Sequence, residues 1–219
     1  MLKLLAVASI FASIAYGVYF TVKPVSWLRS LIKTIPVGAL CLIGFLLDTP
    51  VLLTLALLFG TIGDFALSRA GDRNFLIGLA SFLLGHICLV GLFGQLGSSI
   101  SGIQTSGIGL VVGVVFSSLA LGVFMHIKKH LGPMHLPVAA YVFVSWLLGM
   151  LALQAINQEN LVFAVIGTLL FIVSDIVLAY DLFVIPTPST LRHYTSRTLW
   201  FLYWSGQAMI LYGVYQAGL

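Results

Sequence analysis

Long apolar stretches separated by short polar connections run along the whole chain. A bilayer core about 30 Å thick is crossed by about 20 apolar residues of helix. Eight stretches come close to that length: 2–22, 30–47, 51–68, 74–94, 107–124, 137–156, 160–182 and 198–216. The first continues unbroken to Lys23, further than the apolar part of a signal peptide. The pattern therefore predicts an all-α polytopic membrane protein with eight transmembrane helices in one domain, residues 1–219.

The composition agrees with a protein solvated mainly by lipid. Hydrophobic residues make up 60% of the chain and charged residues only 7%, against about 25% charged residues in soluble domains. The net charge of +4 comes from basic residues spread singly over the connections, so we expect no nucleic-acid partner and the lipid bilayer as surroundings. Cys41 and Cys88 lie within apolar stretches and are expected to be small core residues rather than a disulfide.

The basic residues predict the orientation in the membrane. Nine of the ten lie at one end of the expected helices: Lys23, Arg29, Lys33, Arg69, Arg73, Lys128, Lys129, Arg192 and Arg197. Lys3 alone lies at the other end. Because cytoplasmic connections carry the excess of Lys and Arg, the first end is expected to be cytoplasmic and both termini non-cytoplasmic. The compact connections favour a bacterial inner (cell) membrane.

Two segments of the first half resemble two of the second. KTIPVGAL (33–40) is similar to MHLPVAAY (134–141), and FGTIGDFAL (59–67) is similar to LFIVSDIVL (170–178). The resemblance predicts a 4+4 parallel pseudo-repeat, with halves 1–94 and 107–219 joined by the Gly/Ser/Thr-rich stretch Gln95–Gly107. The alternative is chance similarity between apolar sequences. A true repeat would bring two aspartates, one from each half, near a shared axis.

Those aspartates, Asp64 and Asp175, are the main candidates for function. A carboxylate at the centre of a lipid-facing helix costs at least about 2.5–3.5 kcal/mol, so such residues usually serve a purpose. Two desolvated carboxylates also suit acid/base chemistry, because one can stay protonated while the other ionises. A structural role for Asp64, paired with Lys33 or Arg69, stays open.

The remaining polar residues of the helices gather toward the cytoplasmic end. A rise of 1.5 Å per residue puts Asp64 about 6 Å and Asp175 about 9 Å from that end, with His86 deepest at about 18 Å. The other candidates are Lys33, Tyr203 and Gln207, the last two one turn apart on one helix face. This one-sided distribution favours a cavity open to the cytoplasm over a pore. His86 and Gln207 can instead satisfy core hydrogen bonds, and Lys33 can reach the interface.

Several short motifs together resemble one known family. They are Lys33-x-x-Pro36, Gly63-Asp64, Phe75…Gly78…Phe82…His86, Ser174-Asp175 with Ala179, and Tyr203-Trp204…Gln207. In this order, and across essentially the whole chain, they resemble the lysoplasmalogenase family of membrane proteins (YhhN/TMEM86-like).

The resemblance implies hydrolysis of the vinyl ether bond of lysoplasmalogens, lysophospholipids with an ethanolamine or choline headgroup, to a fatty aldehyde and the glycerophospho-compound. Protonation of the outer alkene carbon gives an oxocarbenium ion that water captures, so one carboxylic acid and one carboxylate suffice, with no metal and no other cofactor. We assign Asp64 and Asp175 as catalytic residues. Asp175 is the favoured acid because it lies deeper and has no cation close in sequence. The expected substrate-binding residues are Lys33, Arg69, Arg73, His86, Tyr203 and Gln207, the first three for the phosphate.

Other functions remain as alternatives. A proton-coupled small-solute transporter fits the aspartates and the repeat, but predicts polar residues in the outer half of the bundle, where few occur. An intramembrane aspartyl protease fits less well, because the motif here is G-T-I-G-D and no Pro-Ala-Leu motif follows. A zinc amidase would need several histidines on helices, and only His86 qualifies. The face of Gly78 and Gly85 can pack within the chain or between chains, which leaves a homo-oligomer open.

Overall fold

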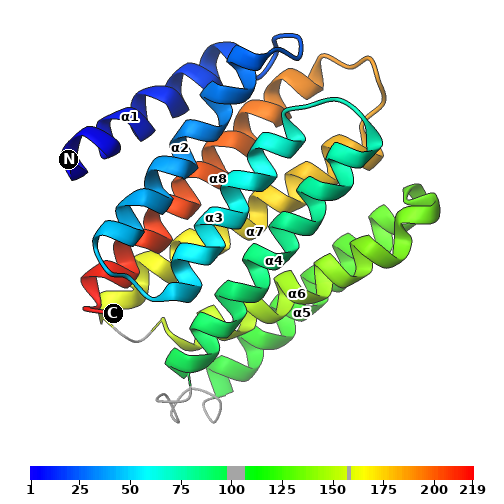
Figure 1. The fold of residues 1–219 in the computed structure, drawn as a ribbon. Helices are drawn as coiled ribbons and strands as arrows, with labels where there is room; N and C mark the ends of the chain where they lie inside the picture. The colour runs from blue at the N-terminus through cyan, green and yellow to red at the C-terminus, as the bar shows by residue number, and fades with distance from the viewer. Residues whose placement is uncertain (98–106, 157–158) are drawn as a thin grey trace.

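The computed structural model describes residues 1–97, 107–156 and 159–219, and all the regular structure in them is helical. The eight α-helices are α1 Leu2–Ala15, α2 Trp27–Leu46, α3 Val51–Leu67, α4 Asp72–Gly97, α5 Gly107–Ile127, α6 His135–Gln154, α7 Val162–Ala179 and α8 Leu191–Gln216 (Figure 1). Five-residue π-helices continue two of them, η1 Tyr16–Phe20 after α1 and η5 Tyr180–Val184 after α7. Each predicted apolar segment therefore forms one helix. Most of the expected linker, residues 98–106, lies outside the described residues.

Six stretches of the described residues are long and apolar enough to cross a membrane: Leu2–Phe20, Trp27–Leu46, Asp72–Leu96, Val111–His130, Gly132–Gln154 and Val162–Val184. The other two predicted spans correspond to helices of a different character. Helix α3 is apolar but only 17 residues long. Helix α8 is long but more polar, and it packs against α7 and α2, which shield residues such as Gln207 from lipid. The chain is thus a multi-pass membrane protein.

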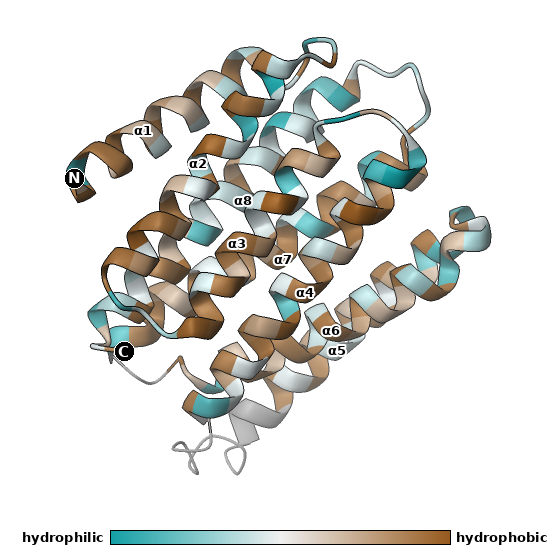
Figure 2. Cartoon of the chain, in the orientation of Figure 1, coloured by the Kyte–Doolittle hydropathy of each residue, from teal (hydrophilic) through white to brown (hydrophobic). Residues whose placement is uncertain are grey.

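The two ends of the bundle differ in character. Both chain termini lie at one end, which we call the terminal end, and the connections 21–26, 68–71, 128–134 and 185–190 lie at the other (Figure 1). Nine of the ten Lys and Arg residues lie in these four connections or within seven residues of them, so we call this the basic end. Apolar residues dominate along the helices, and hydrophilic ones concentrate near the connections (Figure 2). The membrane orientation and the pseudo-repeat stay predictions.

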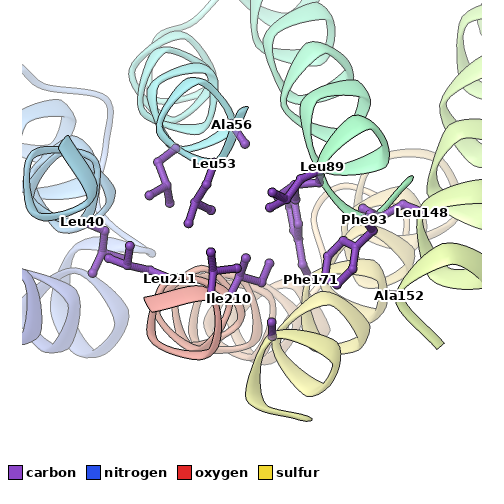
Figure 3. Close-up of a cluster of buried hydrophobic side chains, with 14 of the residues drawn as sticks. Leu40, Leu53, Ala56, Leu89, Phe93, Leu148, Ala152, Phe171, Ile210 and Leu211 are labelled. Atoms are coloured by element: carbon purple, nitrogen blue, oxygen red, sulfur yellow. The ribbon is translucent and has the colours of Figure 1, made fainter. Parts of the chain in front are cut away.

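A dry core fills the half of the bundle nearer the terminal end. Its side chains come from six helices and include Leu40, Leu53, Ala56, Leu89, Phe93, Leu148, Ala152, Phe171, Ile210 and Leu211 (Figure 3). Leu53, Leu89 and Ile210 are completely inaccessible to solvent. The buried acidic side chains, Asp64 and Asp181, lie in the half nearer the basic end, whereas the buried polar groups toward the terminal end, such as Thr49, Thr168 and Gln207, are uncharged.

Helices α7 and α8 approach each other closely through small residues. A Cβ atom at Gly206 would lie 2.7 Å from the backbone oxygen of Gly167, and one at Gly167 would lie 2.6 Å from the oxygen of Gly206. Two turns further along α8, Gly213 faces the backbone of Ala164 in the same way. Membrane helices associate through such small-residue contacts, since lipid offers no hydrophobic driving force between them.

Replacing Gly206 with alanine tests this contact. The added methyl group meets backbone atoms, which cannot move aside as a flexible side chain can, so Gly206→Ala should lower stability by about 1–3 kcal/mol. Gly122→Ala is the matched control, because a Cβ there has no atom within 4 Å. Thermal unfolding of both variants in detergent checks the prediction, and equal midpoints would contradict it.

Candidate functional site

A polar cavity of about 370 Å³ lies in the half of the bundle nearer the basic end. Thr21 and Gly71, from two connections at that end, line its mouth. Its wall contains five of the residues predicted from sequence: Lys33, Asp64, Arg69, Asp175 and Tyr203. The two aspartates, from α3 and α7, therefore share one cavity although 111 residues separate them in the chain.

Asp64 is almost completely buried, with 1% of its side chain exposed, and it is held by two neighbouring helices. The Nζ atom of Lys33 on α2 lies 3.7 Å from its Oδ1 atom. The hydroxyl of Tyr203 on α8 donates a hydrogen bond of 2.9 Å to its Oδ2 atom. Gly60, one turn earlier on α3, leaves room for that hydroxyl, since a Cβ there would lie 3.0 Å from it. Asp64 is thus a carboxylate whose charge is matched within the protein.

Asp175 has a different partner, a histidine from α4. The Nε2 atom of His86 lies 2.9 Å from Oδ2 of Asp175, and the Nδ1 atom of His86 lies 2.9 Å from the carbonyl oxygen of Phe82. Because a carbonyl can only accept, Nδ1 carries a hydrogen. The short contact between Nε2 and Oδ2 is favourable only with one further proton, carried by the imidazole or by the carboxyl group. The pair can therefore share a proton at the wall of the cavity.

The surroundings of this pair fix its geometry. His86 is completely buried between the rings of Tyr141 and Phe171, whose centroids lie 4.9 and 4.4 Å from its own. The hydroxyl of Tyr141 on α6 lies 3.4 Å from Nδ1 of His86 and interacts with Asp175 as well. The side chain of Asp175 is 13% exposed, so one face of the carboxyl group remains accessible from the cavity.

A second cavity, of about 360 Å³, adjoins the first. It is lined almost entirely by apolar side chains of α4, α5, α6 and α7, among them Phe116, Ala120, Val142, Trp146 and Ile176. Asp175 lines both cavities. The carboxyl group therefore lies where a polar chamber meets an apolar one, the arrangement required to hold an amphiphilic molecule at the boundary between its two parts.

Three predicted residues lie outside the polar cavity wall. His86 stands directly behind Asp175, Arg73 is exposed, and Gln207 is buried on α8 one turn from Tyr203. The Oε1 atom of Gln207 has no hydrogen-bond partner among the described residues. The described part of the chain contains no group of three His, Cys, Asp or Glu side chains suited to a metal ion.

Sequence reasoning missed three residues of the site. Tyr141 ends the segment 134–141 that we aligned with 33–40, and a tyrosine inside an apolar helix was the available signal. Arg29 lines the cavity but entered the sequence argument only as a marker of orientation. Asp181 also lines the cavity, beyond the end of α7, where an acidic residue is unremarkable in sequence.

Comparisons with known proteins agree on one family. The sequence model of the YhhN family matches residues 28–214. The chain is 28% identical over 197 residues to the bovine (Bos taurus) protein lysoplasmalogenase TMEM86A, an alignment that covers 84% of this chain and 77% of the relative. It is 36% identical over 171 residues to human (Homo sapiens) lysoplasmalogenase TMEM86B, covering 74% and 67%. No solved structure matches.

The ion pair of Lys33 and Asp64 gives a stability prediction. Lys33→Met leaves a buried carboxylate without its cation and should lower stability by up to about 3 kcal/mol. The double variant Lys33→Met/Asp64→Asn removes both charges and should recover most of that loss. Thermal unfolding in detergent compares them, and a double variant no more stable than Lys33→Met would show that the pair is not coupled.

Proposed function

Because the chain belongs to the YhhN family, we propose that it hydrolyses the vinyl ether bond of lysoplasmalogens, releasing a fatty aldehyde and a glycerophospho-alcohol. The two relatives named lysoplasmalogenase support this assignment. The observation that carries it is the position of Asp175, which lines both the polar and the apolar cavity. A vinyl ether occupies the corresponding boundary in a lysoplasmalogen, between the alkenyl tail and the glycerophosphate.

The substrate then divides between the two cavities according to polarity. The alkenyl tail lies in the apolar cavity between α4, α5, α6 and α7, where its burial contributes about 0.8 kcal/mol per methylene group. The phosphate lies in the polar cavity, within reach of Arg29, Lys33 and Arg69. This mode of binding brings the alkene against Asp175.

The pair of Asp175 and His86 supplies the first proton. Asp175 protonates the outer carbon of the alkene, and the electrons of the double bond form the new C–H bond, which leaves an oxocarbenium ion. Carbon protonation is slow, so holding the acid against the alkene is the main catalytic requirement. The Phe82 carbonyl, by accepting from Nδ1 of His86, orients the imidazole and directs Nε2 at the carboxyl group.

Asp64 acts on the cation. Its carboxylate, matched by Lys33 and Tyr203, stabilises the oxocarbenium ion and accepts a proton from the water that adds to it. The hemiacetal collapses when Asp64 returns this proton to the departing glycerol oxygen and the hemiacetal hydroxyl gives its proton to Asp175. One water molecule is consumed, its oxygen remains in the aldehyde, and both carboxyl groups regain their starting states.

The shape of the bundle supports hydrolysis over transport. The half nearer the terminal end is filled by aliphatic side chains such as Leu53, Leu89 and Ile210, so no described polar path continues from the cavity to that end. A transporter would need a polar surface there in some state of its cycle. We assign the cavity mouth, at the basic end, to the cytoplasmic side of a bacterial inner membrane.

Substituting either aspartate tests the chemistry. Asp175→Asn removes the proton donor and Asp64→Asn removes the carboxylate, so each should reduce aldehyde release from alkenyl lysophosphatidylethanolamine by about 10²–10⁴-fold. Asp48→Asn is the matched control, because Asp48 is exposed in the connection 47–50 and its positive φ of 51° suits asparagine. In D₂O the released aldehyde should carry deuterium on the carbon next to the carbonyl. Full activity of Asp175→Asn would exclude the mechanism.

Narrowing the apolar cavity tests where the tail binds. Ala120→Phe fills part of the cavity, and should lower kcat/KM for long-chain substrates by about 10–100-fold while sparing short-chain ones. Val115→Phe, on the exposed face of the same helix, should leave both unchanged. Aldehyde release from a series of chain lengths checks this, and an equal effect of Ala120→Phe on every length would rule out the tail assignment.

A further inference from the structure

Asp181 is a buried carboxylate that the hydrolytic mechanism does not use. It lies in η5, beyond α7, and only 8% of the residue is exposed. It lines the polar cavity together with the two catalytic aspartates. At 1.5 Å per residue it lies about 9 Å from Asp175 along the helix, toward the basic end.

The partners of Asp181 leave its charge unmatched. Thr195 on α8 donates a hydrogen bond to its Oδ1 atom. The described residues form two ion pairs between acidic and basic side chains, Lys33 with Asp64 and His86 with Asp175, and neither includes Asp181. A buried carboxylate without a cation is costly, so a position of this kind is expected to receive a cation from outside the protein.

Two arginines that line the same cavity also lack a partner of opposite charge in the described part of the chain. The Nε atom of Arg29 donates to the carbonyl oxygen of Phe20 at 3.0 Å, and Nη1 lies 3.4 Å from that of Ser68. Arg69 donates to Ser30 at 3.4 Å and lies over the ring of Trp27. Both guanidinium groups are thus held by neutral groups, and neither is paired with a carboxylate among the described residues.

A cavity lined by two arginines and a buried carboxylate, none of them in an ion pair with another described residue, fits a zwitterion. We propose that Asp181 binds the primary ammonium group of an ethanolamine headgroup whose phosphate lies against Arg29 and Arg69. This inference rests on the proposed function for the class of substrate and adds the headgroup that the site selects. Asp181 accepts hydrogen bonds, which a primary ammonium donates and a quaternary one does not, so ethanolamine is favoured over choline.

The separation along the chain is consistent with this binding mode. With the vinyl ether at Asp175, the glycerol and phosphate extend toward the mouth of the cavity, and the amine comes last. Asp181, about 9 Å further toward the basic end, lies within reach of that amine. A headgroup that ends in hydroxyl groups or in a second negative charge supplies no cation to Asp181. The free-energy cost of burying this carboxylate would then remain.

Binding of saturated ether analogues tests the inference independently of hydrolysis, because they contain no vinyl group. Titration calorimetry of the detergent-purified protein compares alkyl lysophosphatidylethanolamine, its choline counterpart and alkyl glycerophosphate, which has no amine. Asp181→Asn should weaken binding of the ethanolamine compound by about 10–100-fold and leave that of the alkyl glycerophosphate unchanged or stronger. Asp181→Glu should restore part of the loss, and Asp48→Asn should change nothing.

Each outcome separates this inference from the proposed function. An equal loss for the ethanolamine and the amine-free compound would overturn the ammonium site, as would wild-type binding of the choline compound as tight as that of ethanolamine. Headgroup-selective binding that depends on Asp181, in a protein releasing no aldehyde, would support the site and reject the hydrolase. Aldehyde release without dependence on Asp181 would retain the hydrolase and reject the site.

Discussion

The cost of a carboxylate among apolar helices is the constraint on which the rest of this structure depends. Neither Asp64 nor Asp175 can be matched from its own helix, so each requires partners from others. Lys33 and Tyr203 tie α2 and α8 to α3, and His86 ties α4 to α7. The polar contacts therefore hold the same helices that enclose the cavity, and loss of a partner affects packing and chemistry together.

The two aspartates differ in the side chains that contact them, and the proposed mechanism gives them different roles. Asp64 contacts a lysine and the hydroxyl of a tyrosine, and a carboxylate with such partners suits the stabilisation of a cation in the proposed mechanism. A histidine whose Nδ1–H is committed to the Phe82 carbonyl instead shares a proton with Asp175. In the proposed mechanism, different neighbours make Asp175 the acid and Asp64 the base, a division familiar from paired carboxylates in other enzymes.

Much of the fold could be predicted from the lengths of the apolar stretches, because eight helices fill eight stretches. Helix α8 begins at Leu191 rather than near 198, since its first turns carry Arg192 and Arg197 and hydropathy cannot detect a helix that extends beyond lipid. The ion pair of Asp64 with Lys33 is one of the two pairings, with Lys33 or Arg69, that the sequence left open. The contact of Asp175 with His86 was not predicted, because their estimated depths of about 9 and 18 Å ignore the tilt and register of α4 and α7.

The packed aliphatic core toward the terminal end also limits the movement of protons from the cavity across the membrane. A proton held by Asp175 and His86 can exchange with water in the cavity, but Leu89 and Phe93, further along α4, are completely buried among aliphatic groups. Proton movement across a membrane requires polar groups or water at every depth. A cavity closed at its inner end by these described side chains would therefore allow the proposed acid chemistry within the membrane, without a proton pathway through the described part of the bundle.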